Sequence, residues 1–99
     1  MTAAPILDAY HGTHVATPQA GAERVEWARA ADRVARVRVR EVTCSCRWPI
    51  FELCAAGGLA FVRYVSLDDD GSISTLESPW GPAREAARLW TRILNGRAR

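Results

Sequence analysis

The sequence of 99 residues contains no lysine, so all 13 of its basic side chains are arginine. Arginine abundance therefore describes the whole chain and is weak evidence for any particular function. No apolar run approaches the roughly 18 residues that a membrane-spanning helix needs. The N-terminus has neither a basic segment nor a long hydrophobic segment, as a secretory signal would. These absences predict a cytoplasmic protein that does not contact a membrane.

Histidine is scarce, since His11 and His14 are the only two, and the three cysteines are an odd number. In a cytoplasmic protein this favours reduced, buried thiols over disulfides. Both histidines precede the part of the chain that we predict to be ordered, so a nucleophilic cysteine would lack a nearby base. We find no other catalytic motif and predict a protein that is not an enzyme.

What is present is the composition of an ordinary globular protein, with 48% hydrophobic and 24% charged residues. The length corresponds to one domain. Residues 1–16 lack periodicity and predict a flexible arm. Residues 17–96 are predicted to form the single domain, and residues 97–99 a basic tail.

Hydrophobic periodicity predicts a helix at each end of the domain. In residues 17–35, a Thr-Pro helix start precedes an alanine-rich apolar stripe that includes Trp27. In residues 82–94, Trp90 and Ile93 lie on one apolar face. Alternating or apolar segments between them predict strands at 36–48, 51–55, 59–67 and 72–77, with a hairpin turn at Asp68-Asp69-Asp70-Gly71. We therefore expect an α+β fold of α-β-β-β-α order, in which a three- to four-stranded antiparallel sheet carries both helices on one face.

The alternation in residues 36–48 changes phase near Arg40–Glu41. Val37 and Val39 occupy odd-numbered positions, whereas the apolar residues after Glu41 occupy even-numbered positions. Because side chains alternate with a period of two, a flat strand cannot bury both sets on one side. We predict a β-bulge at this point. It would bury a single face made of Val37, Val39, Val42, Cys44, Cys46 and Trp48.

The cysteines raise the question of metal. Cys44, Cys46 and Cys54, with either histidine, could form a Cys₃His zinc site. However, two cysteines that are two residues apart on a strand have Cβ atoms about 6–7 Å apart. The histidines lie some thirty residues away in the predicted arm, where His-x-x-His is expected by chance. We therefore predict no metal and no cofactor, with the thiols filling the core of the sheet.

Arginines alternate along the predicted strand and recur at every fourth position of the last helix. Guanidinium groups bind phosphate through paired hydrogen bonds. A nucleic-acid-associated binding module is therefore our first functional prediction, and a solvated surface is the alternative interpretation of the same side chains. The residues concerned are Arg36, Arg38, Arg40, Arg84, Arg88 and Arg92.

The four tryptophans support a second function. Trp27 and Trp90 are predicted to be core, whereas Trp48 and Trp80 lie at the ends of elements. Exposed aromatic residues often anchor protein interfaces. Trp48, Phe51 and Trp80 therefore predict a contact with a protein partner or a homodimer.

The sheet followed by Ser78-Pro79-Trp80-Gly81-Pro82 and a helix resembles, in element order, the small DNA-binding domains at the N-termini of some phage integrases. With the first helix included, the order also resembles the double-stranded-RNA-binding domain. That family's lysine cluster at the start of its last helix is absent here, and Arg84 and Arg88 are only loose counterparts. Its histidine-containing loop between the first two strands is absent too. The resemblance covers about sixty residues, and fold likeness does not by itself imply function.

Overall fold

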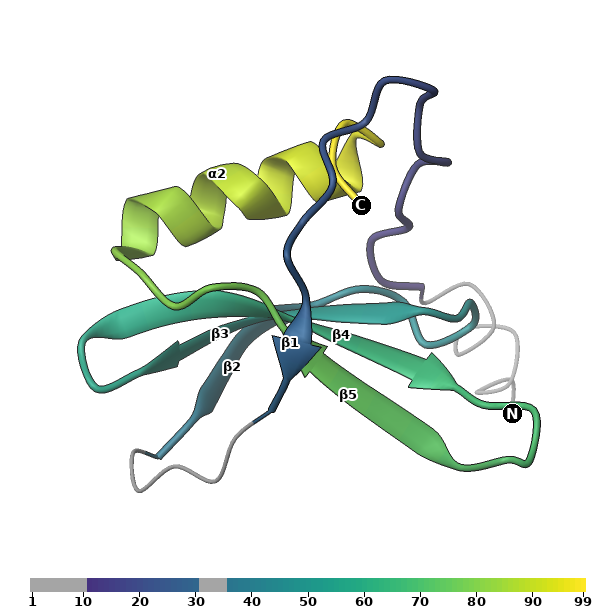
Figure 1. The fold of residues 1–99 in the computed structure, drawn as a ribbon, viewed down its shortest axis with the longest axis horizontal. Helices are drawn as coiled ribbons and strands as arrows, with labels where there is room; N and C mark the ends of the chain where they lie inside the picture. Colours follow the sequence, from purple (N-terminus) through teal and green to yellow (C-terminus); the bar gives the residue numbers. More distant parts are fainter. Residues whose placement is uncertain (1–10, 31–35) are drawn as a thin grey trace, which may run out of the picture.

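The computed structural model of the chain describes residues 11–30 and 36–99. Five strands form one antiparallel sheet, and the helix α2 lies across one face of it (Figure 1). The strand order is β1-β5-β4-β3-β2. The elements are β1 (Ala28–Arg29), β2 (Arg38–Val42), β3 (Ile50–Ala56), β4 (Leu59–Leu67), β5 (Ile73–Glu77) and α2 (Ala83–Leu94).

Two hairpins build the centre of the sheet. Gly57 and Gly58 join β3 to β4 with φ angles of 56° and 80°. A two-residue connection with both φ values positive is the turn that suits the twist of a hairpin. The predicted acidic turn between β4 and β5 is confirmed: the Asp68 N–H donates to the Ser72 carbonyl at 2.8 Å, and Gly71 has a φ of 87°.

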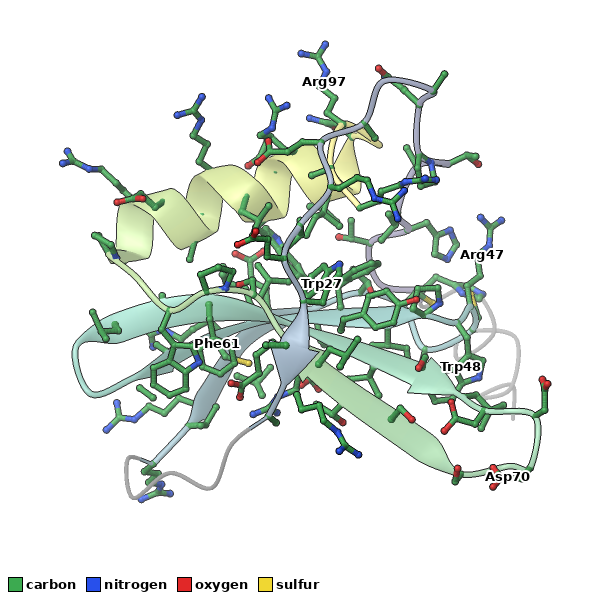
Figure 2. All side chains as sticks on the ribbon, viewed as in Figure 1. Trp27, Arg47, Trp48, Phe61, Asp70 and Arg97 are labelled. Atoms are coloured by element: carbon green, nitrogen blue, oxygen red, sulfur yellow. The ribbon has the colours of Figure 1, made fainter. Side chains whose placement is uncertain are left out.

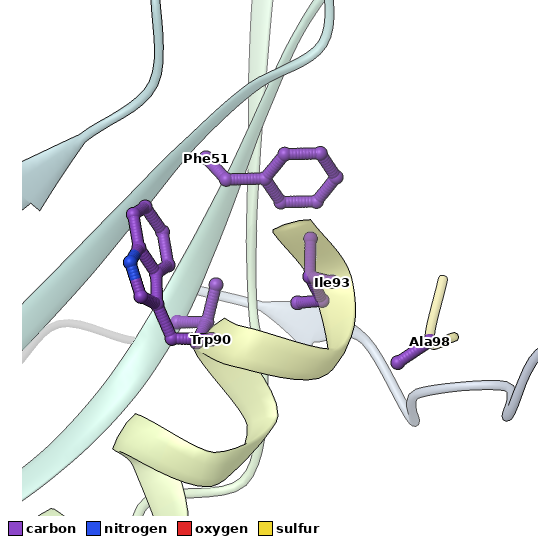
Figure 3. Close-up of a cluster of buried hydrophobic side chains, with 5 residues drawn as sticks. Phe51, Trp90, Ile93 and Ala98 are labelled. Atoms are coloured by element: carbon purple, nitrogen blue, oxygen red, sulfur yellow. The ribbon is translucent and has the colours of Figure 1, made fainter. Parts of the chain in front are cut away.

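The main core lies between the sheet and α2. Phe51 and Val62 come from the central strands, and Trp90 and Ile93 from the helix. Figure 3 shows Phe51 beside Trp90 and Ile93, with Ala98 beyond the end of the helix. The predicted apolar face of the last helix is thus confirmed at Trp90 and Ile93, which are buried, and Ala86 is buried as well.

The predicted fold class is wrong, because the sheet has five strands and, in the described ranges, α2 is the only helix. Within the predicted N-terminal helix, residues 22–30 contain no helix and include an isolated bridge at Glu23 and the short strand β1, while 31–35 lie outside the described residues. The Glu23 N–H donates to the Arg97 carbonyl at 2.8 Å, and the Val25 N–H to the Arg99 carbonyl at 2.7 Å. These long-range partners override a local helical preference. The α-β-β-β-α order that resembled the double-stranded-RNA-binding domain is consequently not found.

The predicted bulge is confirmed, but the buried face is not. Val39 pairs with Cys54 and Glu41 pairs with Leu53, so Arg40 is the extra residue. This puts Val39 and Val42 on the same face, as expected. They are nevertheless 48% and 50% exposed, because β2 is an edge strand and the two valines share the face of their partners Cys54 and Glu52, opposite the face that α2 covers.

Residues at both ends of the described chain pack together at the end of α2 (Figure 1). The Ala16 N–H donates to the Leu94 carbonyl at 3.0 Å, and the Gln19 N–H donates to the Gly96 carbonyl at 2.8 Å. Ala98 is 2% exposed. In the described part of the chain, no helix is long and apolar enough to cross a membrane.

Candidate metal centre

Four side chains that lie far apart in the sequence meet at one point. The ligand atoms of His11, His14, Cys44 and Cys46 all lie within 4.8 Å of one another. Cys44 Sγ is 3.2 Å from both His11 Nδ1 and Cys46 Sγ. Cys46 Sγ is 3.3 Å from His14 Nε2. The cluster therefore presents two sulfur and two nitrogen donors toward a shared centre.

These separations can be compared with those of a metal site. A tetrahedral zinc ion, with Zn–S of about 2.3 Å and Zn–N of about 2.0–2.1 Å, places its ligand atoms about 3.3–3.8 Å apart. The S–S contact of 3.2 Å and the two S–N contacts of 3.2 and 3.3 Å are shorter than the spacings between zinc-bound atoms of the same kind, while the complete set of ligand atoms lies within 4.8 Å. The four donors are therefore close enough to share one ion after small side-chain movements.

A tight loop brings the two cysteines together. Strand β2 ends at Val42, so Cys44 and Cys46 lie in a turn and not on a strand. The loop is closed at its base, where the Thr43 N–H donates to the Phe51 carbonyl and the Phe51 N–H donates to Thr43 Oγ1, both at 2.9 Å. Thr43 is only 4% exposed. A buried anchor thus holds a pair of thiols, of which Cys44 is half-buried and Cys46 is exposed.

The histidines reach the loop because their segment runs alongside it. Thr13 pairs with Thr43 in a parallel bridge, and the Cys44 N–H donates to the Thr13 carbonyl at 2.8 Å. The two segments lie directly against each other, since a Cβ atom at Gly12 would be in van der Waals contact with Cys44 Cα at 3.4 Å. His11 and His14 flank this contact, and their rings lie 5.5 Å apart.

The two thiols of the loop have different acidities. Hydrogen bonds with the backbone of Cys46, then with its side chain and with His11, lower the pKa of Cys44 to about 5. The neighbouring Cys44 sulfur raises the pKa of Cys46 above its ordinary value. Cys44 is therefore a thiolate at neutral pH, which is the form that binds metals.

The expectation that all three thiols are buried is wrong for two of them. Cys44 is half-buried and Cys46 is exposed, whereas Cys54 is fully buried on β3. The prediction against metal rested on strand spacing, which does not apply to a turn. The zinc site considered there also counted Cys54 as a third ligand with one histidine, whereas the cluster contains both histidines and not Cys54. The signal in the sequence was the combination of His-x-x-His and Cys-x-Cys, since each motif contributes two side chains to the cluster.

The predicted partner-interface residues do not form one exposed patch. Trp48 is 44% exposed, but Phe51 is 6% exposed and belongs to the core. Trp80 is half-buried and stacks on Phe61, with ring centroids 4.3 Å apart. Of the three, only Trp48 is exposed. A contact with a protein partner or a second copy of the chain remains a prediction.

The arginines predicted to bind phosphate fall on separate surfaces. Arg36, Arg38 and Arg40 are exposed at the β2 edge, while Arg84 and Arg88 are exposed on α2. The helix packs on β3 and β4 and does not contact β2. Arg92 is already paired, because its Nε lies 3.0 Å from Glu23 Oε1. Nucleic-acid binding stays a prediction, with two smaller sets in place of one continuous surface.

Comparisons with protein-family models, with curated proteins and with solved structures found no match to this chain.

Proposed function

We propose that this chain binds a zinc ion through His11, His14, Cys44 and Cys46, and that it works as a small zinc-stabilised binding module. The observation that carries the proposal is the convergence of the four donor atoms within 4.8 Å. Two thiols and two imidazoles, with no carboxylate, form one of the common ligand sets of structural zinc. Mixed sulfur and nitrogen donors favour zinc over magnesium or calcium, which prefer oxygen.

The number of ligands favours a structural role. Catalytic zinc sites keep a position open for water or substrate, whereas structural sites are closed by four protein ligands. Here four side chains offer the full number of ligands that a structural zinc ion takes. This supports a protein that is not an enzyme, in which the metal joins the N-terminal segment to the loop after β2.

Cobalt substitution tests the ligand set. Tetrahedral Co²⁺ absorbs visible light strongly, and each bound thiolate adds charge-transfer absorption in the near ultraviolet. We expect Co²⁺ to bind the metal-free chain with one equivalent, to show both signals and to be displaced by Zn²⁺. Cys46→Ser should lower the charge-transfer band by about half or abolish binding.

Two further variants make the result specific. His14→Cys offers a third thiolate and should increase the charge-transfer absorption, a gain that misfolding would not produce. Cys54→Ala removes the one cysteine outside the cluster and should leave the spectrum unchanged. An octahedral, weakly coloured cobalt spectrum, or a spectrum that depends on Cys54, would refute the proposed site.

A further inference from the structure

A cavity lies beside the proposed metal centre. Its volume is about 550 Å³, within the range of about 300–1,000 Å³ that is typical of small-molecule sites. The segment 13–18 and the loop after Thr43 form one side. The sheet and the end of α2 form the other side, with mainly apolar walls that include Val25, Trp27, Phe51, Tyr64, Leu76 and Ile93.

Three aromatic rings shape the cavity wall. Trp27 and Tyr64 have ring centroids 5.3 Å apart, and Phe51 meets Tyr64 edge to face at the same distance. Figure 2 labels Trp27 between the sheet and the helix. These rings hold one another in place, so the wall is rigid, and it offers π surfaces to an apolar guest.

Apart from the proposed metal ligands His14 and Cys44, the charged residues that line the cavity all have the same sign. Arg24, Arg47 and Arg99 line it, and no aspartate or glutamate does. This asymmetry is local, because the whole chain has 11 acidic against 13 basic residues. The three are exposed, and the ion pairs among the described residues involve other arginines, Arg63 and Arg92. Figure 2 shows Arg47 and Trp48 at the same end of the molecule.

We propose that this cavity binds a small organic acid whose body is apolar and about the size of one or two rings. The body would lie against Trp27, Phe51 and Tyr64, where burial of apolar surface provides most of the affinity. The acidic group would stay at the opening, where guanidinium groups donate charge-assisted hydrogen bonds. Because two thiolates neutralise a zinc ion, the arginines and not the metal attract the anion.

A matched pair of fluorescent probes tests this proposal. The sulfonated dye 8-anilinonaphthalene-1-sulfonate has an aromatic body and an acidic group, and N-phenyl-1-naphthylamine has nearly the same body without charge. We expect the sulfonate to bind the full chain saturably at one site and more tightly than the neutral dye. The metal content of the same sample is measured, so a failure of this site and a failure of the metal site remain distinguishable.

Two double variants assign the binding. Arg24→Gln with Arg47→Gln should weaken sulfonate binding roughly ten-fold, the equivalent of one charge-assisted hydrogen bond, with little effect on the neutral dye. Arg84→Gln with Arg88→Gln makes the same charge change on α2, outside the cavity, and should change neither affinity. Circular dichroism in the near ultraviolet checks that each variant stays folded. Equal losses in the two double variants, no preference for the sulfonate, or unsaturable binding would overturn the proposal.

Discussion

The three cysteines differ in both exposure and acidity. Cys54 is fully buried, and desolvation by this burial raises its pKa to about 11. Cys44 has its pKa lowered to about 5 by hydrogen bonds, chiefly with Cys46. A thiolate and not a thiol is the reactive form, so the two side chains should behave as chemical opposites.

Alkylation of the metal-free chain should reveal this difference. Any pH between 6 and 8 is above the pKa of Cys44, so this thiol stays ionised. Iodoacetamide should therefore modify Cys44 at a nearly constant rate that falls only as the pH approaches 5. The same pH range is far below the pKa of Cys54, which therefore stays a thiol and should react only after unfolding. Peptide mass mapping identifies the modified residue.

Zinc provides the control for the alkylation experiment. Metal added first should protect Cys44 and Cys46 and leave Cys54 as unreactive as before. Rapid native modification of Cys54, or no protection of Cys44 by zinc, would contradict the assigned environments.

Among the elements, the end of α2 is the point at which distant parts of the chain are joined. Gly96 has a φ of 74°, and a Cβ atom there would lie 2.5 Å from the Thr17 carbonyl oxygen. Glycine is therefore required for two reasons, its backbone conformation and the close approach of the segment that begins with the histidines. Gly58 has a similar φ of 80° with nothing within 4 Å of the added Cβ atom.

Gly96→Ala should consequently destabilise the fold more than Gly58→Ala. We expect the strained backbone alone to cost about 1–2 kcal/mol in Gly58→Ala. Gly96→Ala should lower the free energy of unfolding by at least about 1 kcal/mol more, because the added methyl group meets backbone that cannot move aside without breaking its hydrogen bonds. Urea denaturation of the two variants measures both losses, and equal values would show that the Thr17 contact does not matter.

Local patterns predicted the local elements well. The Asp68–Gly71 turn, the bulge at Arg40 and the buried face of α2 follow from periods and turn residues within a few positions of one another. The segment containing Trp27 was predicted wrongly, because its alanine-rich stripe resembles a helix while its backbone partners are residues 97–99. A periodic pattern contains no information on such distant pairing.

At the scale of the whole molecule, the proposed metal centre connects the segment 11–14 to the loop that follows β2. A chain of this size buries one modest core, and its stability is expected to be about 5–15 kcal/mol. A ligand present at a thousand times its dissociation constant would add about 4 kcal/mol to that value. Zinc would thus be a large part of what keeps these segments together.

The proposed metal centre could be predicted only in part from the sequence. Both ligand pairs were visible as His11-x-x-His14 and Cys44-x-Cys46, but their meeting depends on the bridge between Thr13 and Thr43. It depends also on β2 ending before the cysteines. Both facts belong to the folded chain. Strand spacing applied to residues 44 and 46 led instead to the prediction that the chain binds no metal.

The most direct test is elemental analysis of the chain purified from zinc-supplemented culture, without an affinity tag that binds metal. The account predicts close to one zinc per chain, retained through gel filtration, and close to none in the double variant Cys44→Ser with Cys46→Ser. A zinc-to-chain ratio near zero in the folded parent chain would contradict the proposed metal centre.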